Sequence, residues 1–297
     1  MIGNILKNQV KFLLIESVLM FWIVQQDLYN EVGFRTLCHV LERLEIPHVF
    51  VKPVAGTSKI LPGDFDSFAY KGEIEDAPDA EIDESGLVMV CGSLSLSKAA
   101  KARGWTPGAF TNDDFRFEKW LEHYGDENIL NASAKVMRFD EVTDLGKPFF
   151  IRPCEDNKAF TGIVYNEWYE FGDWQHKVVV LKEKNSMSTA HAETMVIVSD
   201  VQYILREYRF FVVDGKVVTG SLYKQGDYVC YSSDVEPYVW EYAQRMTDVW
   251  QPARAFCLDI AIVSDGPKVL EINCINSAGF YAIDVMKFVG AIEGMEF

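Results

Sequence analysis

The sequence has few of the features that mark secreted, zinc-binding or membrane-spanning proteins. Its 297 residues include six cysteines, and no two of them form a C-x-x-C pair. This spacing argues against a disulfide framework and against a zinc site. An apolar run near the amino terminus, FLLIESVLMFWIV, is interrupted by Glu16 and is shorter than the roughly 20 residues that span a bilayer. We therefore expect a cytoplasmic protein with reduced thiols and no membrane segment.

Basic residues are also scarce. Lys and Arg number 28 against 44 Asp and Glu, which gives a formal net charge of -16. Such a charge repels phosphate backbones and disfavours general nucleic-acid binding, so a small-molecule or peptide partner fits better. No Ser-His-Asp or Cys-His pattern is recognisable, and no repeat or low-complexity tract occurs. With 49% hydrophobic residues, the chain can bury a sizeable core in two domains or one elaborated one.

The first third of the chain alternates strand and helix patterns. The expected elements are a strand at 21–24, a helix at 31–44, strands at 48–52 and 87–91, and a helix at 94–103. This alternation is typical of a small parallel α/β layer. Residues 53–86 are expected to be mostly surface loop, and residues 1–19 are either an added amphipathic helix or an appendage. We place a soft domain boundary near residue 110, between domains at 1–110 and 111–297.

A hairpin pattern near the carboxyl end carries three oxygen-bearing side chains. Two β-type runs, 257–263 and 268–273, flank the turn sequence Ser-Asp-Gly-Pro. With a three-residue loop, Asp259 lies opposite Glu271, and alternation puts both on one face with Asn273. The other face is expected to be apolar and to consist of Leu258, Ile260, Ile262, Leu270 and Ile272.

Two carboxylates directly opposite each other repel and destabilise a bare sheet, so this arrangement favours a cation between them. Carboxylate and amide oxygens, with no His or Cys on that face, suit Mg²⁺ held jointly with nucleotide phosphates. The solvated face of an ordinary antiparallel pair accounts for the same spacing with about equal weight. Spacing alone therefore leaves both interpretations open.

A second hairpin pattern precedes the first. Strands at 208–213 and 216–223 flank the turn Asp214-Gly215. Alternation puts Glu207 and Arg209 on one face of this hairpin. Because an exposed pair of this kind contributes little to stability, a chance placement is an open alternative.

A cation follows a short apolar strand in the middle of the chain. Residues 149–151 have the strand pattern, Arg152 ends it, and the polar loop 154–162 contains Lys158. Guanidinium and ammonium groups at such a position can stabilise phosphate charge. A solvated surface charge is the alternative for each cation, and for Lys135 it has about equal weight.

Five other segments complete the expected elements. They are a connection with one helix at 105–131, strands at 177–181 and 195–199, a helix at 235–256 with a break near Pro252, and a terminal helix after the loop 274–281.

The strings D-I-A-I-V and V-L-E-I-N, followed by a small-residue loop, resemble the carboxy-terminal metal hairpin of the ATP-grasp superfamily. The resemblance extends from about Lys135 to Tyr281, and the pattern is also similar to a divergent, often phage-borne branch with arginine at a usual lysine position. It implies an α/β (α+β) ATP-grasp fold. A small amino-terminal α/β lobe would precede two α+β subdomains that clasp ATP.

The resemblance also implies roles for particular residues. Arg152, Lys158 and Arg209 would be the catalytic groups, with Arg209 on the acceptor carboxylate. ATP contacts are implied for Lys135, Arg152, Lys158, Val198, Ser199 and Glu207, Mg²⁺ contacts for Asp259, Glu271 and Asn273, and acceptor contacts for Arg209, Asn276 and Ser277. The loop 154–162 departs from the family pattern, because it has one terminal glycine where many relatives have several.

The implied activity is ATP-dependent, ADP-forming ligation, in which a carboxylate is activated as an acyl phosphate and joined to an amine. Two alternatives stay open: an ATP-grasp phosphotransferase, and a nucleotide-binding interaction module without turnover. The sequence names neither the acid nor the amine.

Overall fold

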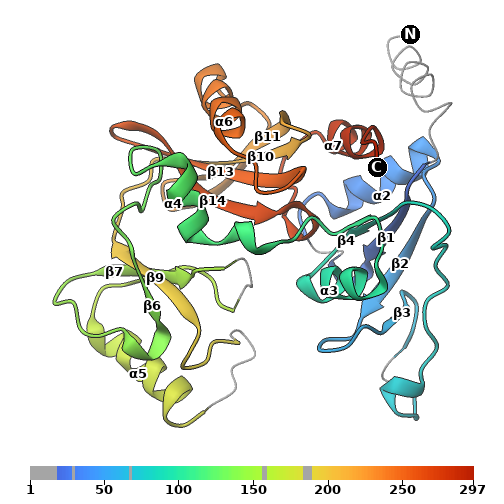
Figure 1. Cartoon of the computed structure of the whole chain (residues 1–297), viewed down its shortest axis with the longest axis horizontal. Helices are drawn as coiled ribbons and strands as arrows, with labels where there is room; N and C mark the ends of the chain where they lie inside the picture. Colours follow the sequence, from blue (N-terminus) through green and yellow to red (C-terminus); the bar gives the residue numbers. More distant parts are fainter. Residues whose placement is uncertain (1–18, 29–30, 67–68, 156–158, 183–188) are drawn as a thin grey trace.

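The computed structural model describes residues 19–28, 31–66, 69–155, 159–182 and 189–297. The predictions for residues 1–18 and for Lys158 therefore lie outside the described residues. Three mixed or antiparallel β-sheets form the framework, which we call sheets A, C and B in chain order (Figure 1). The predicted α/β (α+β) class is confirmed.

Sheet A forms the amino-terminal lobe, with strand order β3-β2-β1-β4-β5. Its strands are β1 Phe21–Gln25, β2 His48–Pro53, β3 Ile60–Pro62, β4 Val88–Cys91 and β5 Pro107–Gly108, and its helices are α2 Phe34–Leu44 and α3 Leu94–Arg103. All pairings are parallel except that of β2 with β3. The two helices pack on opposite faces, because α2 contributes to one apolar core and α3 to another. The predicted parallel layer is confirmed.

Sheet C lies at the lower left of Figure 1, with order β6-β9-β7-β8. Its strands are β6 Lys135–Arg138, β7 Phe149–Pro153, β8 Ile163–Tyr165 and β9 Met195–Asp200. The predicted strand at 177–181 is wrong: most of it belongs to helix α5, Trp168–Val179. Phe171 and Val178 are buried on one stripe of this helix whereas Val180 and Leu181 are exposed, so helical aromatic packing outweighs the β-branched run.

Sheet B is antiparallel, with order β12-β11-β10-β13-β14. Its strands are β10 Arg206–Val213, β11 Lys216–Gln225, β12 Tyr228–Ser232, β13 Ala255–Val263 and β14 Gly266–Cys274, accompanied by helices α4 Phe117–Tyr124, α6 Pro237–Val249 and α7 Val285–Glu293. The helix predicted at 235–256 ends at Val249, and β13 already begins at Ala255. The edge strand β12 is not among the predicted elements.

The register of the hairpin β13–β14 is confirmed, although the reason for it differs. Asp259 does pair with Glu271. The turn is one residue shorter than predicted, since Val263 pairs with Gly266, and a bulge at Leu270 restores the pairing. The bulge moves Val269 rather than Leu270 into the buried apolar face, opposite Ile260.

The two faces of sheet B have different coverings. One face, with Tyr208, Phe210 and Val212, packs into an apolar core with α4 and α6. On the other face Phe211 and Val213 lie under α7, in a core shared with β1 and α2. Glu207 and Arg209 follow on that second face beyond the part that α7 covers. One half of this face is thus sealed by a helix, and the other half is available for a polar site.

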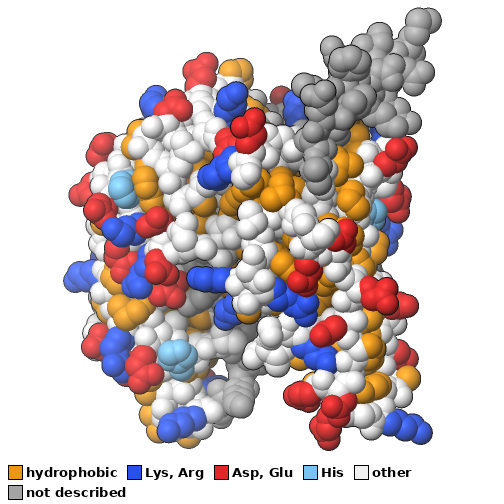
Figure 2. All heavy atoms as spheres, turned by 45° about the vertical axis from the view of Figure 1, so that its right-hand side comes forward, with side chains coloured by type: hydrophobic (Ala, Val, Ile, Leu, Met, Phe, Trp, Pro, Cys, Tyr) orange, Lys and Arg blue, Asp and Glu red, His pale blue; other side chains and the backbone are white. Residues whose placement is uncertain are grey.

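Helix α7 also ties sheet B to the amino-terminal lobe. Its residue Glu293 is buried, and its carboxylate accepts hydrogen bonds from Trp22 Nε1 at 2.6 Å and from the Met20 amide at 3.1 Å. In the part of the chain that the structure describes, no helix is both long and apolar enough for a membrane crossing. Figure 2 shows the surface hollowed between two arms of the molecule, with Lys and Arg side chains gathered at the top of the hollow.

Candidate functional site

A row of charged side chains crosses the uncovered half of sheet B. Glu207 and Arg209 come from β10, Asp259 from β13, and Glu271 with Asn273 from β14. Strand pairing brings them together, because Arg209 pairs with Asp259 and Asp259 pairs with Glu271. The residues that alternation puts on one face of each hairpin therefore form one common face, and we call these five residues the acidic face.

Arg209 and Asp259 form the buried centre of the acidic face. Arg209 donates to both carboxylate oxygens of Asp259, at 2.8 Å from Nε and 2.7 Å from Nη2. Asp259 is only 1% exposed, and burial raises its pKa although the Arg209 guanidinium lowers it. The third guanidinium nitrogen of Arg209, Nη1, has no hydrogen-bond partner among the described residues. It is the edge from which Arg209 can still bind an anion.

Arg152 joins sheet C to sheet B. Its Nη1 donates to Glu271 Oε1 at 2.9 Å, across 119 positions in sequence. Its guanidinium also stacks over the ring of Trp120 in α4, at 4.6 Å from the ring centroid. Nη2 of Arg152 is buried without a partner among the described residues, as is Nε1 of Trp120. A buried donor without a partner is costly, and a bound anion would satisfy it.

Glu207 lies in a third polar cluster on the same face. Its carboxylate accepts from Tyr223 Oη at 2.8 Å and from Lys224 Nζ at 3.0 Å. The sequence interpretation missed both partners. Tyr223 could have been found, because it lies two residues beyond Ser221, which pairs with Arg209. Trp120 gave no such signal, since its contact with Arg152 depends on the packing of a helix against another element.

The other predicted nucleotide residues lie on sheet C. Lys135 is exposed at the start of the edge strand β6. Val198 pairs with β6 on one side and with β7 on the other, so its backbone lies within the sheet. Ser199 and Asp200 pair only with β7. An unpaired backbone edge, as base recognition requires, therefore begins one residue later than the predicted segment.

Asn276 is not brought to the acidic face. Its side chain is 1% exposed, donates to the Val90 carbonyl at 2.7 Å and accepts from the Phe110 amide at 2.8 Å. Its backbone carbonyl accepts from the Gly92 amide at 2.8 Å. These bonds join the loop after β14 to the amino-terminal lobe and engage both the oxygen and the nitrogen of the side chain. The next residue, Ser277, is half-buried.

A family model for the ATP-grasp domain, family 3 of its clade, matches residues 92–292. This range contains sheets B and C entirely, together with every residue of the acidic face. The chain belongs to this ATP-grasp family. The resemblance seen in the sequence is thereby confirmed at the level of the superfamily. The match includes Lys135, Arg152 and the hairpin β13–β14 in one domain, whose two sheets meet through the contact of Arg152 with Glu271.

The solved structure of a RimK domain protein ATP-grasp from Sphaerobacter thermophilus DSM 20745 agrees with this fold. It is similar with a TM-score of 0.54 and 12% identity, over 91% of this chain and 98% of that one. The ATP-grasp ligase PsnB, solved with a minimal precursor, also matches, with a TM-score of 0.48 and 13% identity over 94% of this chain and all of the other. No curated protein sequence matches the chain.

The acidic face of this ATP-grasp domain has oxygen donors that fit a Mg²⁺ ion. Glu271 has a second carboxylate oxygen, and Asn273 an amide oxygen, without a partner among the described residues. Both oxygens of Asp259 are engaged by Arg209, so a metal would have to share them. Within the described ranges, no group of three His, Cys, Asp or Glu side chains could hold a metal, so the amide of Asn273 has to complete the set. Hard oxygen donors of this kind suit Mg²⁺.

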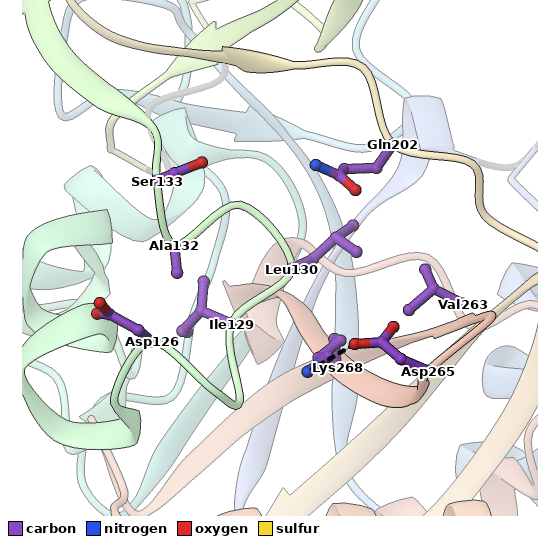
Figure 3. Close-up of a pocket in the computed structure, with 9 residues that line it drawn as sticks. All are labelled: Asp126, Ile129, Leu130, Ala132, Ser133, Gln202, Val263, Asp265 and Lys268. Atoms are coloured by element: carbon purple, nitrogen blue, oxygen red, sulfur yellow. Dashed lines mark ion pairs between the residues drawn. The ribbon is translucent and has the colours of Figure 1, made fainter.

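A separate cavity of about 270 Å³ lies at the turn end of the hairpin β13–β14 (Figure 3). It is lined by the 126–133 loop, by Gln202, and by Val263, Asp265 and Lys268 of the hairpin. Asp265 and Lys268 form an ion pair at 3.4 Å. None of the predicted site residues lines this cavity, so we assign it no part in the site.

Arg152 is predicted to need its planar fork. Arg152→Lys keeps a charge near Glu271 but loses the Trp120 stack and the unpaired Nη2, so ATP affinity should fall by about 3- to 10-fold. For Arg152→Ala we expect about a 100-fold loss. Calorimetric titration with a non-hydrolysable ATP analogue measures both. Arg138→Lys, on the edge strand of the same sheet and paired with Asp140, is the control, and wild-type affinity in Arg152→Ala would refute the assignment.

Proposed function

We propose that this protein is an ATP-dependent, ADP-forming carboxylate–amine ligase. The observation that carries the proposal is the contact of Arg152 on sheet C with Glu271 on sheet B, which brings a cation with an unsatisfied donor against the predicted metal hairpin. Family membership supports ATP as the nucleotide. The acidic composition, with a net charge of -16, is consistent with a small-molecule or peptide acceptor.

In this proposal the two sheets hold different parts of the nucleotide. Lys135 and Arg152 contact phosphates from sheet C, and the backbone from Ser199 onwards contacts the base. Glu271 and Asn273, with a shared oxygen of Asp259, would hold Mg²⁺, which neutralises phosphate charge when bound. Lys158 stays a predicted phosphate contact outside the described residues.

Arg209 would bind the acceptor carboxylate through the edge that faces away from Asp259. A carboxylate oxygen then attacks the γ-phosphorus, the bond to the β-phosphate oxygen breaks, and ADP leaves. The amine nitrogen next attacks the acyl carbon of the acyl phosphate, the carbon–oxygen bond to phosphate breaks, and the amine proton leaves with phosphate or solvent. The chain supplies positioning and charge rather than a nucleophile.

The amino-terminal lobe at 1–110 is proposed to form the far wall of the acceptor site, with the ATP-grasp domain at 111–297. Asn276 has the structural part of holding the two together, since its hydrogen bonds reach β4 and Phe110. Ser277 stays a candidate acceptor contact.

The test uses hydroxylamine to intercept the activated acid. The full-length protein is supplied with ATP, Mg²⁺, pooled amino acids and small carboxylates, and ADP release is measured with and without hydroxylamine. We expect ADP release that depends on the carboxylate pool, together with a hydroxamate identified by mass spectrometry. Acceptor-dependent ADP release without any hydroxamate would overturn the ligase and leave a phosphotransferase, which forms no acyl phosphate. ATP binding with no ADP release for any pool would also overturn it.

A further inference from the structure

We propose that the edge strand β12 and a ladder of three tyrosines form the docking surface for an extended peptide, which is the acceptor substrate. The inference rests on the proposed ligase function and adds the substrate class. Sheet B has β12 at its edge, and no described strand pairs with the outer side of β12. Its backbone N–H and C=O groups on that side are therefore available to a further strand.

The composition of β12 is unusual for an exposed edge. Its five residues, YVCYS, carry no charge and include no proline. Tyr228 is 81% exposed, Val229 68% and Tyr231 44%. Proteins protect such edges with lysine, proline, bulges or covering elements, because an apolar edge recruits other strands. An edge left apolar and uncovered next to an active site is suited to bind a strand from a substrate.

A ladder of tyrosine rings connects this edge to the acidic face. Tyr231 of β12 stacks on Tyr281 with ring centroids 5.3 Å apart, and Tyr281 stacks on Tyr223 at 4.9 Å. Arg209 lies over the Tyr281 ring, 5.1 Å from its centroid. Tyr281 has a φ of 49°, a left-handed conformation that bulky residues rarely adopt. Its ring is therefore held between the edge strand and Arg209 against a local backbone preference.

This continuity defines where the bound peptide would lead. A segment paired with β12 lies beside Tyr231, and the ladder runs from there to the guanidinium proposed to bind the acceptor carboxylate. The exposed acids Asp227 and Asp234 flank the strand, and neither has an ion-pair partner among the described residues. An extended, β-branched or aromatic segment flanked by basic residues is thus the complementary partner.

A second copy of this chain is a weaker occupant of the same edge. A stable protein dimer buries about 1,200 Å² or more, which is more than pairing of two five-residue strands provides. Two chains that each carry a net charge of -16 also repel. A basic peptide is instead attracted by this charge.

The test compares two pools of synthetic peptides on the full-length protein. Each peptide has lysines flanking a variable segment, one internal glutamate and a free terminal carboxylate. One pool contains Val, Ile, Thr, Tyr and Phe in the segment, and the matched pool has proline at alternate positions, which cannot pair as a strand. ADP release is measured in the presence of pooled amino acids as amines. A second readout, independent of turnover, is the rate at which iodoacetamide alkylates Cys230, the exposed thiol of β12.

The matched variants are Val229→Lys, which places a charge on the edge, and Val229→Thr, which keeps a β-branched neutral residue. We expect the strand-forming pool to slow Cys230 alkylation and support ADP release. Its KM should rise about tenfold or more in Val229→Lys, the equivalent of one or two lost hydrogen bonds, and stay within about twofold in Val229→Thr. The KM for ATP should be unchanged in both.

Equal behaviour of the two pools, or of Val229→Lys and the wild type, in both readouts would overturn the docking surface. Protection of Cys230 without ADP release would uphold docking and reject the ligase. ADP release with small carboxylates but no protection by peptides would reject docking and uphold the ligase. A concentration-dependent dimer that Val229→Lys abolishes, without peptide protection, would assign the edge to a second copy and also overturn the proposal.

Discussion

Glu271→Gln is expected to reduce Mg²⁺-dependent ADP release by about 10²- to 10³-fold, because the variant removes one negative charge from the proposed metal set. The fold should survive. The Glu271 side chain is 34% exposed, and the amide oxygen of glutamine can still accept the hydrogen bond from Arg152 Nη1. Steady-state ADP release over a Mg²⁺ titration measures the effect, and thermal unfolding checks the fold.

The control for this prediction is Glu241→Gln. Glu241 is an exposed carboxylate on α6, so its replacement removes the same charge from the protein without changing the acidic face. Turnover in Glu271→Gln within twofold of that control would exclude Glu271 from metal binding. A loss of turnover accompanied by a large fall in melting temperature would instead mark the Arg152–Glu271 contact as structural.

Arg209→Lys is expected to lower the acceptor kcat/KM by about one and a half to three decades while the KM for ATP changes little. Lysine keeps a positive charge beside Asp259 but cannot bind one carboxylate bidentately and still present a second edge to another. Pooled acceptors and the hydroxylamine assay give both parameters. The matched control is Arg206→Lys, which lies on the same strand, faces the opposite side and pairs with Glu236. Equal acceptor kcat/KM in the two variants would contradict the role of Arg209.

The alanine variant should behave differently, because Arg209 neutralises a carboxylate that is 1% exposed. Leaving that charge unpaired should cost about 3–5 kcal/mol of stability. Burial already raises the pKa of Asp259, and Arg209→Ala removes the partner that lowers it. A raised pKa gives stability that is present at low pH and is lost as pH rises through the folded-state pKa. The difference in unfolding free energy between wild type and Arg209→Ala should therefore be larger at pH 8 than at pH 5.

Local patterns were sufficient to predict the acidic face. Strand alternation alone put Asp259, Glu271 and Asn273 together, and separately paired Glu207 with Arg209, because side-chain direction repeats every two residues whatever lies around the strand. The same reasoning misplaced Leu270, since a bulge changes the count within the strand and depends on how two strands fit. It also mistook residues 177–181 for a strand, because a β-branched run is a weaker determinant than the packing of Phe171.

What the sequence by itself determined about this protein is the set of strands and the residues that each presents. What only the tertiary structure decided is which charges neutralise one another. Arg152 and Glu271 are 119 positions apart, Arg209 and Asp259 are 50 apart, and Trp120 reaches Arg152 from a helix. Such contacts have no periodicity to reveal them, because they arise from the packing of whole sheets and helices against each other. The tyrosine ladder and the apolar edge of β12 depend on the same packing.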